Sequence, residues 1–246
     1  MSRIKSEEFR QWNERMVMKY DPDAFHQHPN PFVRFIESKR VRTILKLMET
    51  HEDDRVIELG CGAGNVIEKV SRGKLFGVDI SSFILTKAKK KLDQTVFLFQ
   101  GDAQNLPCKN GVFMHVICSE VLEHLLDPSI SLHEIKRVLD PQGMAVISVP
   151  NELWINRIKR ILITIGIFNW LLHRKGEYKE MPEKMEDEWH LHNYSLVEWL
   201  NLFEKSFKVT RVKKIPFVWL PLRYVVRLEK KDKKIIYDIG MDPQKI

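Results

Sequence analysis

Short apolar runs alternate with segments of helical periodicity through the middle of the chain. Five of these runs have the length of a buried strand, at residues 56–59, 74–79, 95–100, 112–118 and 144–151. A continuous apolar run is typical of a strand that is covered on both faces of a parallel sheet. The succession of strands and helices therefore predicts an α/β fold, with a doubly wound, mostly parallel sheet and helices on both faces.

The segment before this core is predicted to be helical. Apolar residues recur at helical spacing within residues 1–50, and prolines interrupt the pattern at Pro22, Pro29 and Pro31. Such an amphipathic segment buries its apolar face against a neighbouring layer. We therefore expect residues 1–50 to form a helical cover on a main domain of residues 51–246.

The segment after the core is more irregular. Residues 152–189 combine an apolar face with arginines and lysines, and we expect a lid inserted into the domain. A basic helix lying in a membrane interface is the alternative. Ser195 is expected to cap a following helix. The last strand is either 224–228 or 234–238, and the sequence does not choose between them.

The first strand ends in three glycines at alternate positions, in Glu58-Leu59-Gly60-Cys61-Gly62-Ala63-Gly64. Glycine lets a ligand approach the main chain, because no Cβ stands in the way. Helical spacing resumes after the glycines, so they are expected to lie where a strand turns into a helix with free N–H groups. An acid inside the loop suits an ammonium group better than a diphosphate, which argues against the dinucleotide that G-x-G-x-x-G would bind.

Two further carboxylates follow the next two predicted strands. Asp79 lies at about the spacing from Gly60 at which an acid meets ribose hydroxyls, and Asp102 follows the third strand in Gly101-Asp102-Ala103. Ligands of open α/β sheets bind at the carboxyl ends of the strands. The sequence therefore predicts that Asp79, Asp102 and the glycine loop share one site.

The motifs between Arg55 and Asn151 together resemble the core of the class I S-adenosylmethionine-dependent methyltransferases of the small-molecule type. The resemblance implies a seven-stranded Rossmann-like sheet and S-adenosylmethionine as the cofactor. It implies that the glycine loop holds the methionine end, that Asp79 holds the ribose, and that Asp102 and Ala103 hold the adenine. The residues assigned to the cofactor in this way are Glu58, Gly60, Cys61, Gly62, Gly64, Asp79, Ile80, Asp102, Ala103 and Ser119.

The amino-acid composition indicates in which cellular compartment the protein works and which partners it could bind. The 246 residues are 43% hydrophobic and 30% charged, which is enough apolar material for one domain with a full core. The three cysteines lack the paired spacing of a zinc site or disulfide framework, and no apolar run reaches bilayer length, so a cytoplasmic protein is expected. The formal net charge of +7 makes nucleic acid or an anionic membrane surface conceivable partners, although terminal lysines usually protect a strand edge.

Methyl transfer requires a nucleophile in line with the sulfonium and a group that removes its proton. The candidate catalytic residues are His124 and Glu120, just after the fourth strand, and His190, after the lid. His192 is expected to be a surface or packing histidine.

Glu120-x-x-Glu123-His124 also resembles the metal site of ubiquinone-pathway O-methyltransferases and of plant small-RNA 2′-O-methyltransferases, in which a later histidine, matched here by His190, completes the set. The same pattern occurs in family members without a metal. A divalent cation therefore stays open, and no metal ligand is assigned.

The resulting expectation is a methyltransferase that acts on a small or lipid-like acceptor, at a hydroxyl group. The alternatives are RNA 2′-O-methylation, a non-catalytic regulatory protein that binds the cofactor, and an NAD-linked oxidoreductase. The sequence leaves the acceptor, the methylated atom and the oligomeric state open.

Overall fold

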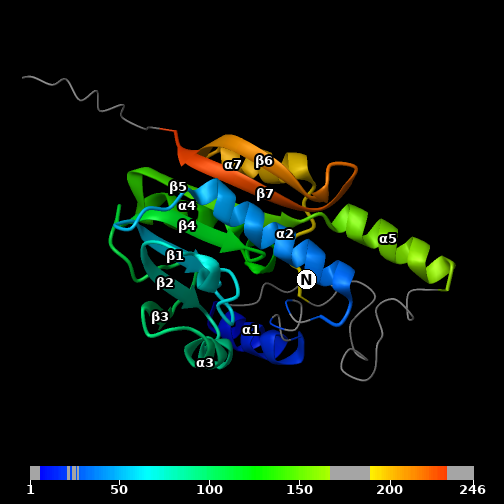
Figure 1. The fold of residues 1–246 in the computed structure, drawn as a ribbon, viewed down its shortest axis with the longest axis horizontal. Helices are drawn as coiled ribbons and strands as arrows, with labels where there is room; N and C mark the ends of the chain where they lie inside the picture. Colours follow the sequence, from blue (N-terminus) through cyan, green and yellow to red (C-terminus); the bar gives the residue numbers. More distant parts are fainter. Residues whose placement is uncertain (1–5, 21–22, 24–25, 27, 167–188, 232–246) are drawn as a thin grey trace, which may run out of the picture.

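A single seven-stranded sheet forms the centre of the protein in the computed structural model, which describes residues 6–20, 23, 26, 28–166 and 189–231 (Figure 1). The strand order is β3-β2-β1-β4-β5-β7-β6. The first five strands in this order pair in parallel, and β7 is antiparallel to both β5 and β6. The strands are β1 (Arg55–Leu59), β2 (Lys74–Asp79), β3 (Val96–Gln100), β4 (Phe113–Ser119), β5 (Leu139–Pro150), β6 (Phe207–Phe217) and β7 (Leu220–Lys230).

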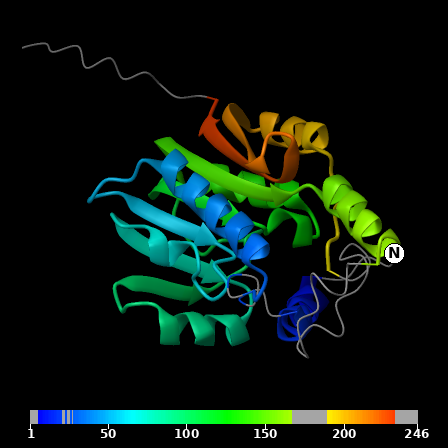
Figure 2. The same cartoon turned by 45° about the vertical axis from the view of Figure 1, so that its right-hand side comes forward.

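Helices cover both faces of the sheet, as the doubly wound prediction requires. Figures 1 and 2 show α2 crossing one face, with α4 and α7 on the other. Adjacent residues of one strand point to opposite faces, so Val56 packs in the core beneath α2 while Ile57 packs in the opposite core. The helices are α1 (Ser6–Tyr20), α2 (Pro31–Met48), α3 (Ser82–Lys91), α4 (Pro128–Val138), α5 (Glu152–Thr164) and α7 (Leu196–Glu204).

The two helices expected near the N-terminus are present. Asn30 caps α2 by accepting from Phe32 N at 2.8 Å, and Pro31 occupies the first turn, where its missing N–H costs nothing. The apolar face of α2 is buried through Ile36, Val41 and Ile44. It contacts β5, β6 and β7, so this helix belongs to the main hydrophobic core.

The helix expected directly after the glycine loop is absent. The chain makes only a short 3-10 helix there, η2 (Ile67–Lys69). Three residues separate Val70 from the start of β2 at Lys74, which is too short a segment for an α-helix and its return to the sheet. Gly73, with a φ of +103°, turns this short connection back. The prediction of a helix N-terminus facing the ligand is therefore wrong.

One of the two candidate last strands lies in the described part of the sheet. Residues 224–228 form the middle of β7, and residues 234–238 lie outside the described part of the chain. Ser195 caps α7 as expected and forms a reciprocal capping box with Glu198. Of the predicted lid, the described residues show α5, and residues 167–188 lie outside the description. Among the described helices, none has the length and hydrophobicity needed to cross a membrane.

Candidate active site

A cavity of about 840 Å³ opens at the carboxyl ends of the parallel strands. The loops after β1, β2, β3 and β4 contribute to its wall, which is where an open α/β sheet binds its ligands. Helices α1, α2 and α5 close the sides, and Arg223 of β7 also faces the cavity. All the predicted site residues line this cavity except Gly64.

The glycine loop has the geometry that only glycine tolerates. Gly60 and Gly62 have φ values of +63° and +53°. A Cβ on Gly60 would lie 2.4 Å from Cγ2 of Val121, so this residue also permits close packing of the loop against the segment after β4. Gly64 has a φ of +81°, and its Cβ would meet Leu92 at the end of α3 at 2.5 Å. Gly64 therefore packs against α3, behind the cavity wall.

Two carboxylates are held by the loop itself. Glu58 is 2% exposed and accepts from Ile67 N at 2.9 Å, and burial raises its pKa to about 8. Asp79 accepts from Gly62 N and Ser81 N, both at 2.9 Å. Burial raises the pKa of Asp79 to about 6, against the opposing effect of these backbone donors. The N–H groups expected to face the ligand are thus partly used to hold these acids.

The other predicted cofactor residues lie around these acids. Cys61 is buried and ties the loop to β2 through its N–H, which donates to Val78 O at 3.0 Å. Asp102 accepts from Gln104 N at 2.8 Å, which fixes the turn after β3. Ile80, Ala103 and Ser119 complete the lining on this side. The structure therefore brings the glycine loop, Asp79 and Asp102 to one cavity.

A buried network of arginines and carboxylates lies beyond Ser119, and sequence reasoning missed it. Arg40 of α2 is 4% exposed and binds Glu37 through two nitrogens, at 2.6 and 3.0 Å. Its guanidinium also donates to Ser119 Oγ. Arg223 Nε lies 2.6 Å from a Glu120 carboxylate oxygen. The available signal was the place of Glu37 and Arg40 on the apolar face of α2, where unpaired charges would be costly.

Glu120 belongs to this network. It has a φ of +57°, a rare conformation for a residue with a side chain. Its other carboxylate oxygen accepts from Ser148 Oγ at 2.9 Å. Glu120 is therefore a structural partner of Arg223 and Ser148 at the edge of the cavity.

The remaining members of the Glu-x-x-Glu-His pattern meet His190. Ligand atoms of Glu123, His124 and His190 all lie within 4.8 Å of one another, and Glu120 is not in this group. His190 Nδ1 lies 2.7 Å from Glu152 Oε1, and His124 Nδ1 lies 3.2 Å from Trp189 O. Each imidazole thus has one nitrogen turned to an acceptor, and the other nitrogen stays available.

Glu123 stands out within this group. It is 1% exposed, and neither carboxylate oxygen has a hydrogen-bond partner among the described residues. Burial, followed by the charge of Glu120, raises its pKa well above the usual range. Burial, and then the neighbouring His190, lowers the pKa of His124 well below its usual value. The group is suited to receive a cation or a proton from a ligand.

The wall farthest from the strands is apolar. Phe32 and Val33 of α2 face Ile155, Ile158 and Leu162 of α5 across the cavity. A ligand in this cavity would meet polar groups at the strand ends and apolar side chains between α2 and α5. His192, expected to pack or face solvent, is fixed outside the group by Leu125 O at 2.8 Å.

Residues 57–147 match the family model described as a methyltransferase domain. Among curated proteins, the chain is similar to the ubiquinone biosynthesis O-methyltransferase of Rhodopseudomonas palustris (strain TIE-1), with 24% identity over 68% of this chain and 67% of that protein. It is similar to the demethylmenaquinone methyltransferase of Staphylococcus carnosus, with 30% identity over 48% of this chain and 52% of that protein.

An uncharacterized 37.1 kDa transposon protein of Streptomyces fradiae is 27% identical over 44% of this chain and 33% of its own length. The matched regions thus span from a third to two thirds of these relatives. Among solved structures, a SAM-dependent methyltransferase of Thermotoga maritima superposes with a TM-score of 0.63 and 20% identity, covering 91% of this chain and 100% of that one. At this level of identity, the structural match shows a shared fold.

The two glycines of the loop make a matched pair for mutation. We expect Gly60→Ala to destabilise the protein more than Gly62→Ala, because both residues have a positive φ but only Gly60 faces Val121 at close range. The shared backbone strain costs about 1–2 kcal/mol, and the overlap at Gly60 adds roughly another 1–3 kcal/mol. Urea unfolding of both variants measures the difference. Equal losses would contradict the packing role given to Gly60.

Proposed function

Because the chain is a class I S-adenosylmethionine-dependent methyltransferase, by its domain at residues 57–147 and by its fold, we propose that it transfers a methyl group to a hydroxyl of a small acceptor with an apolar portion. The observation that supports this most directly is the convergence of the glycine loop, Asp79 and Asp102 on one cavity with an apolar mouth.

The cofactor would lie along the ends of β1, β2 and β3. In this proposal Asp79 accepts from the ribose hydroxyls and Asp102 accepts from the adenine amine. The positively charged methionine end lies over the loop near Glu58. A cation there is favoured because burial, which raises the pKa of Glu58, outweighs the opposing effects of the Ile67 N–H and Arg40.

The acceptor would enter between α2 and α5. Its apolar part would contact Phe32, Ile158 and Leu162, which line the mouth of the cavity. The names of the two quinone-pathway relatives agree with an acceptor that is partly apolar. The buried Arg40 and the half-buried Arg223 line the polar end of the cavity, and each is paired with a carboxylate, so neither adds an uncompensated charge.

His190 is the candidate for removing the acceptor proton. Its Nδ1 faces the Glu152 carboxylate at 2.7 Å, an arrangement that holds the imidazole ring in one orientation. His124, whose pKa is lowered well below the usual value, would stay neutral beside it. Glu120 would act by fixing Arg223 and would not take part in proton transfer.

The same group also fits a divalent cation, because Glu123 offers two buried carboxylate oxygens without a partner. Two imidazoles and a carboxylate are suitable ligands for zinc, manganese or iron. Contacts such as those of His190 with Glu152 and of His124 with the Trp189 carbonyl commonly orient metal-binding histidines. A cation bound there would lower the pKa of an acceptor hydroxyl.

Cofactor binding should depend on pH through the two acids held by the loop. S-adenosylmethionine favours their ionised forms, so its affinity should fall as the pH is lowered from about 8 through about 6, the raised pKa values of Glu58 and Asp79. The stability of the ligand-free protein should depend on pH in the opposite direction. Because the pKa values of Glu58 and Asp79 in the folded protein lie above the ordinary ones, these two groups lower the stability progressively as the pH rises toward 8.

Isothermal titration with S-adenosylmethionine across this range measures the effect. Asp79→Asn should weaken binding roughly tenfold or more and remove the part of the pH dependence near pH 6, and Asp93→Asn, at an exposed position on the far side of α3, should change neither. Tight binding of NADH without binding of S-adenosylmethionine would contradict the proposed cofactor.

The acceptor is tested by methyl transfer. Protein incubated with methyl-labelled S-adenosylmethionine should label dihydroxylated aromatic compounds that carry an isoprenoid chain more efficiently than the same head groups without the chain. Labelling of RNA alone would contradict a small apolar acceptor, and tight cofactor binding without labelled product would indicate a regulatory role.

Glu123→Gln and Glu120→Gln should have opposite effects on stability. Glu123 has a strongly raised pKa and no partner, so its neutral replacement should keep or raise the melting temperature. Glu120→Gln removes the carboxylate that lies 2.6 Å from the half-buried Arg223 and leaves this arginine with Glu37 at 3.9 Å. The loss of this charged hydrogen bond should cost about 1.5–3 kcal/mol. In a cobalt(II) titration followed by absorbance, only Glu123→Gln should weaken binding, by more than roughly tenfold. Equal cobalt spectra for all three proteins would exclude a cation at Glu123.

A further inference from the structure

Four aromatic side chains form a continuous row on the surface, from the mouth of the cavity to the turn between β6 and β7. The ring centroids of Phe32 and Phe35 are 6.4 Å apart, those of Phe35 and Phe217 are 6.0 Å apart, and those of Phe217 and Trp219 are 5.0 Å apart. Phe32 also lines the cavity. The row thus connects the acceptor entrance with the tip of the β6–β7 hairpin.

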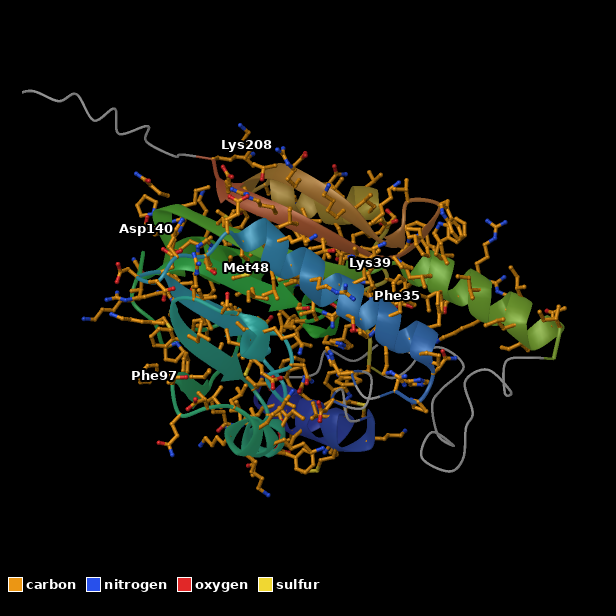
Figure 3. The ribbon with its side chains drawn as sticks, viewed as in Figure 1. Phe35, Lys39, Met48, Phe97, Asp140 and Lys208 are labelled. Carbon is orange, nitrogen blue, oxygen red and sulfur yellow. The ribbon has the colours of Figure 1, made fainter. Side chains whose placement is uncertain are left out.

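The side chains at the tip of this hairpin are apolar but highly exposed. Val218 and Trp219 are 75% and 71% exposed, the two highest values among the large hydrophobic residues of the described chain. Apolar side chains that are exposed together at a turn are typical of a surface that binds a partner or a membrane. Figure 3 shows Phe35 and Lys39 on the half of α2 nearer to α5, with Phe97 at the opposite edge of the sheet.

Lysines surround the aromatic row. A groove of about 490 Å³ runs between α2 and the hairpin, and its basic lining residues are Lys39, Lys46, Lys213 and Lys214. Lys39 Nζ lies 4.6 Å from the centroid of Phe217. The single acid of α2, Glu37, is buried against Arg40, and β6 contains no acid. The groove is therefore positive and has an apolar rim.

Protection of an edge strand explains only part of this arrangement. Lysines on β6 would discourage pairing at the end of the sheet. They do not explain the exposed Val218 and Trp219 beyond the paired residues. A second copy of the chain is a poor partner for this surface, because two basic grooves would repel each other.

The chemistry favours lipid over RNA. Binding of single-stranded RNA uses aromatic faces on which bases stack. Here the rings of Phe217 and Trp219 are stacked on each other, with 2° between their planes. Val218, the most exposed apolar residue of the tip, has no ring to offer a base. Tryptophan and aliphatic side chains beside lysines are typical of the interface of an anionic bilayer.

We propose that Phe32, Phe35, Lys39, Lys46, Lys213, Lys214, Phe217, Val218 and Trp219 form a docking face for an anionic lipid bilayer. Val218 and Trp219 enter the interfacial layer, and the four lysines bind lipid phosphates. Because Phe32 belongs both to this face and to the cavity mouth, docking would place the acceptor entrance at the membrane surface. Only this last consequence rests on the proposed function.

Vesicle cosedimentation of the full chain, without cofactor, tests the docking face. The protein should bind vesicles of phosphatidylcholine with phosphatidylglycerol and should bind phosphatidylcholine alone weakly. Lys213→Gln with Lys214→Gln should weaken binding to the anionic vesicles roughly thirtyfold, and Val218→Ser with Trp219→Ser should also weaken it severalfold. All four positions are exposed, and thermal melts would confirm that these variants are folded.

Two control variants carry comparable substitutions elsewhere, two Lys→Gln changes in one and two apolar-to-Ser changes in the other. Lys89→Gln with Lys90→Gln on α3, and Val197→Ser with Ile130→Ser on α7 and α4, alter exposed residues away from the docking face. These variants should bind vesicles like the unchanged protein. Equal losses in test and control variants, absence of binding to anionic vesicles, or binding of a single-stranded RNA oligonucleotide in place of vesicles would each overturn the proposal. Cofactor titration is independent of all these outcomes.

Discussion

The burial of carboxylates at the carboxyl ends of the parallel strands is the constraint on which the site depends. Glu58, Asp79 and Glu123 all lie away from bulk water, and burial raises the pKa of each. A buried negative charge is costly unless it is paired. Backbone N–H groups hold Glu58 and Asp79, and glycines with positive φ let one of these donors, that of Gly62, turn toward Asp79. Neither carboxylate oxygen of Glu123 has a hydrogen-bond partner among the described residues. The site is therefore prepared for positively charged partners, as a sulfonium cofactor or a divalent cation would be.

Helix α2 contributes to the charge pairing at the strand ends. Arg40 comes from α2 and Arg223 from β7, yet both reach the ends of β4 and β5, where they pair with Glu37 and Glu120. Arg40 also donates to Ser119 at the end of β4, and Arg223 lies 3.9 Å from Glu37, so these contacts connect α2 with the strand ends. The polar end of the cavity is thus preorganised, while α2 and α5 provide an apolar approach to it. This division matches an acceptor with a reactive polar end and an apolar remainder.

The apolar side of the cavity continues onto the outer surface of the protein. Phe32 is shared by the cavity mouth and the aromatic row, and the row ends at the exposed Trp219. From the sequence, a membrane contact was an alternative for residues 152–189 and a less favoured possibility for the basic C-terminal residues. The structure gives a separate reason to look at α2 and the β6–β7 hairpin, because there the apolar tip and the lysines occur together in described residues. An acceptor that partitions into lipid would reach the cavity from this side.

The sequence by itself determined the sheet and the position of the glycine loop. Continuous apolar runs identify buried strands, and glycines between a strand and an acid identify a close approach to the main chain, because both signals are local. Local periodicity failed after Val66, where the short connection to β2 permits only a 3-10 turn. Only the tertiary structure decided which charges meet. His190 joins Glu123 and His124 across 66 residues, while Glu120, three residues from Glu123, pairs with Arg223. Such pairings depend on which strand ends lie side by side, and residue spacing does not encode that.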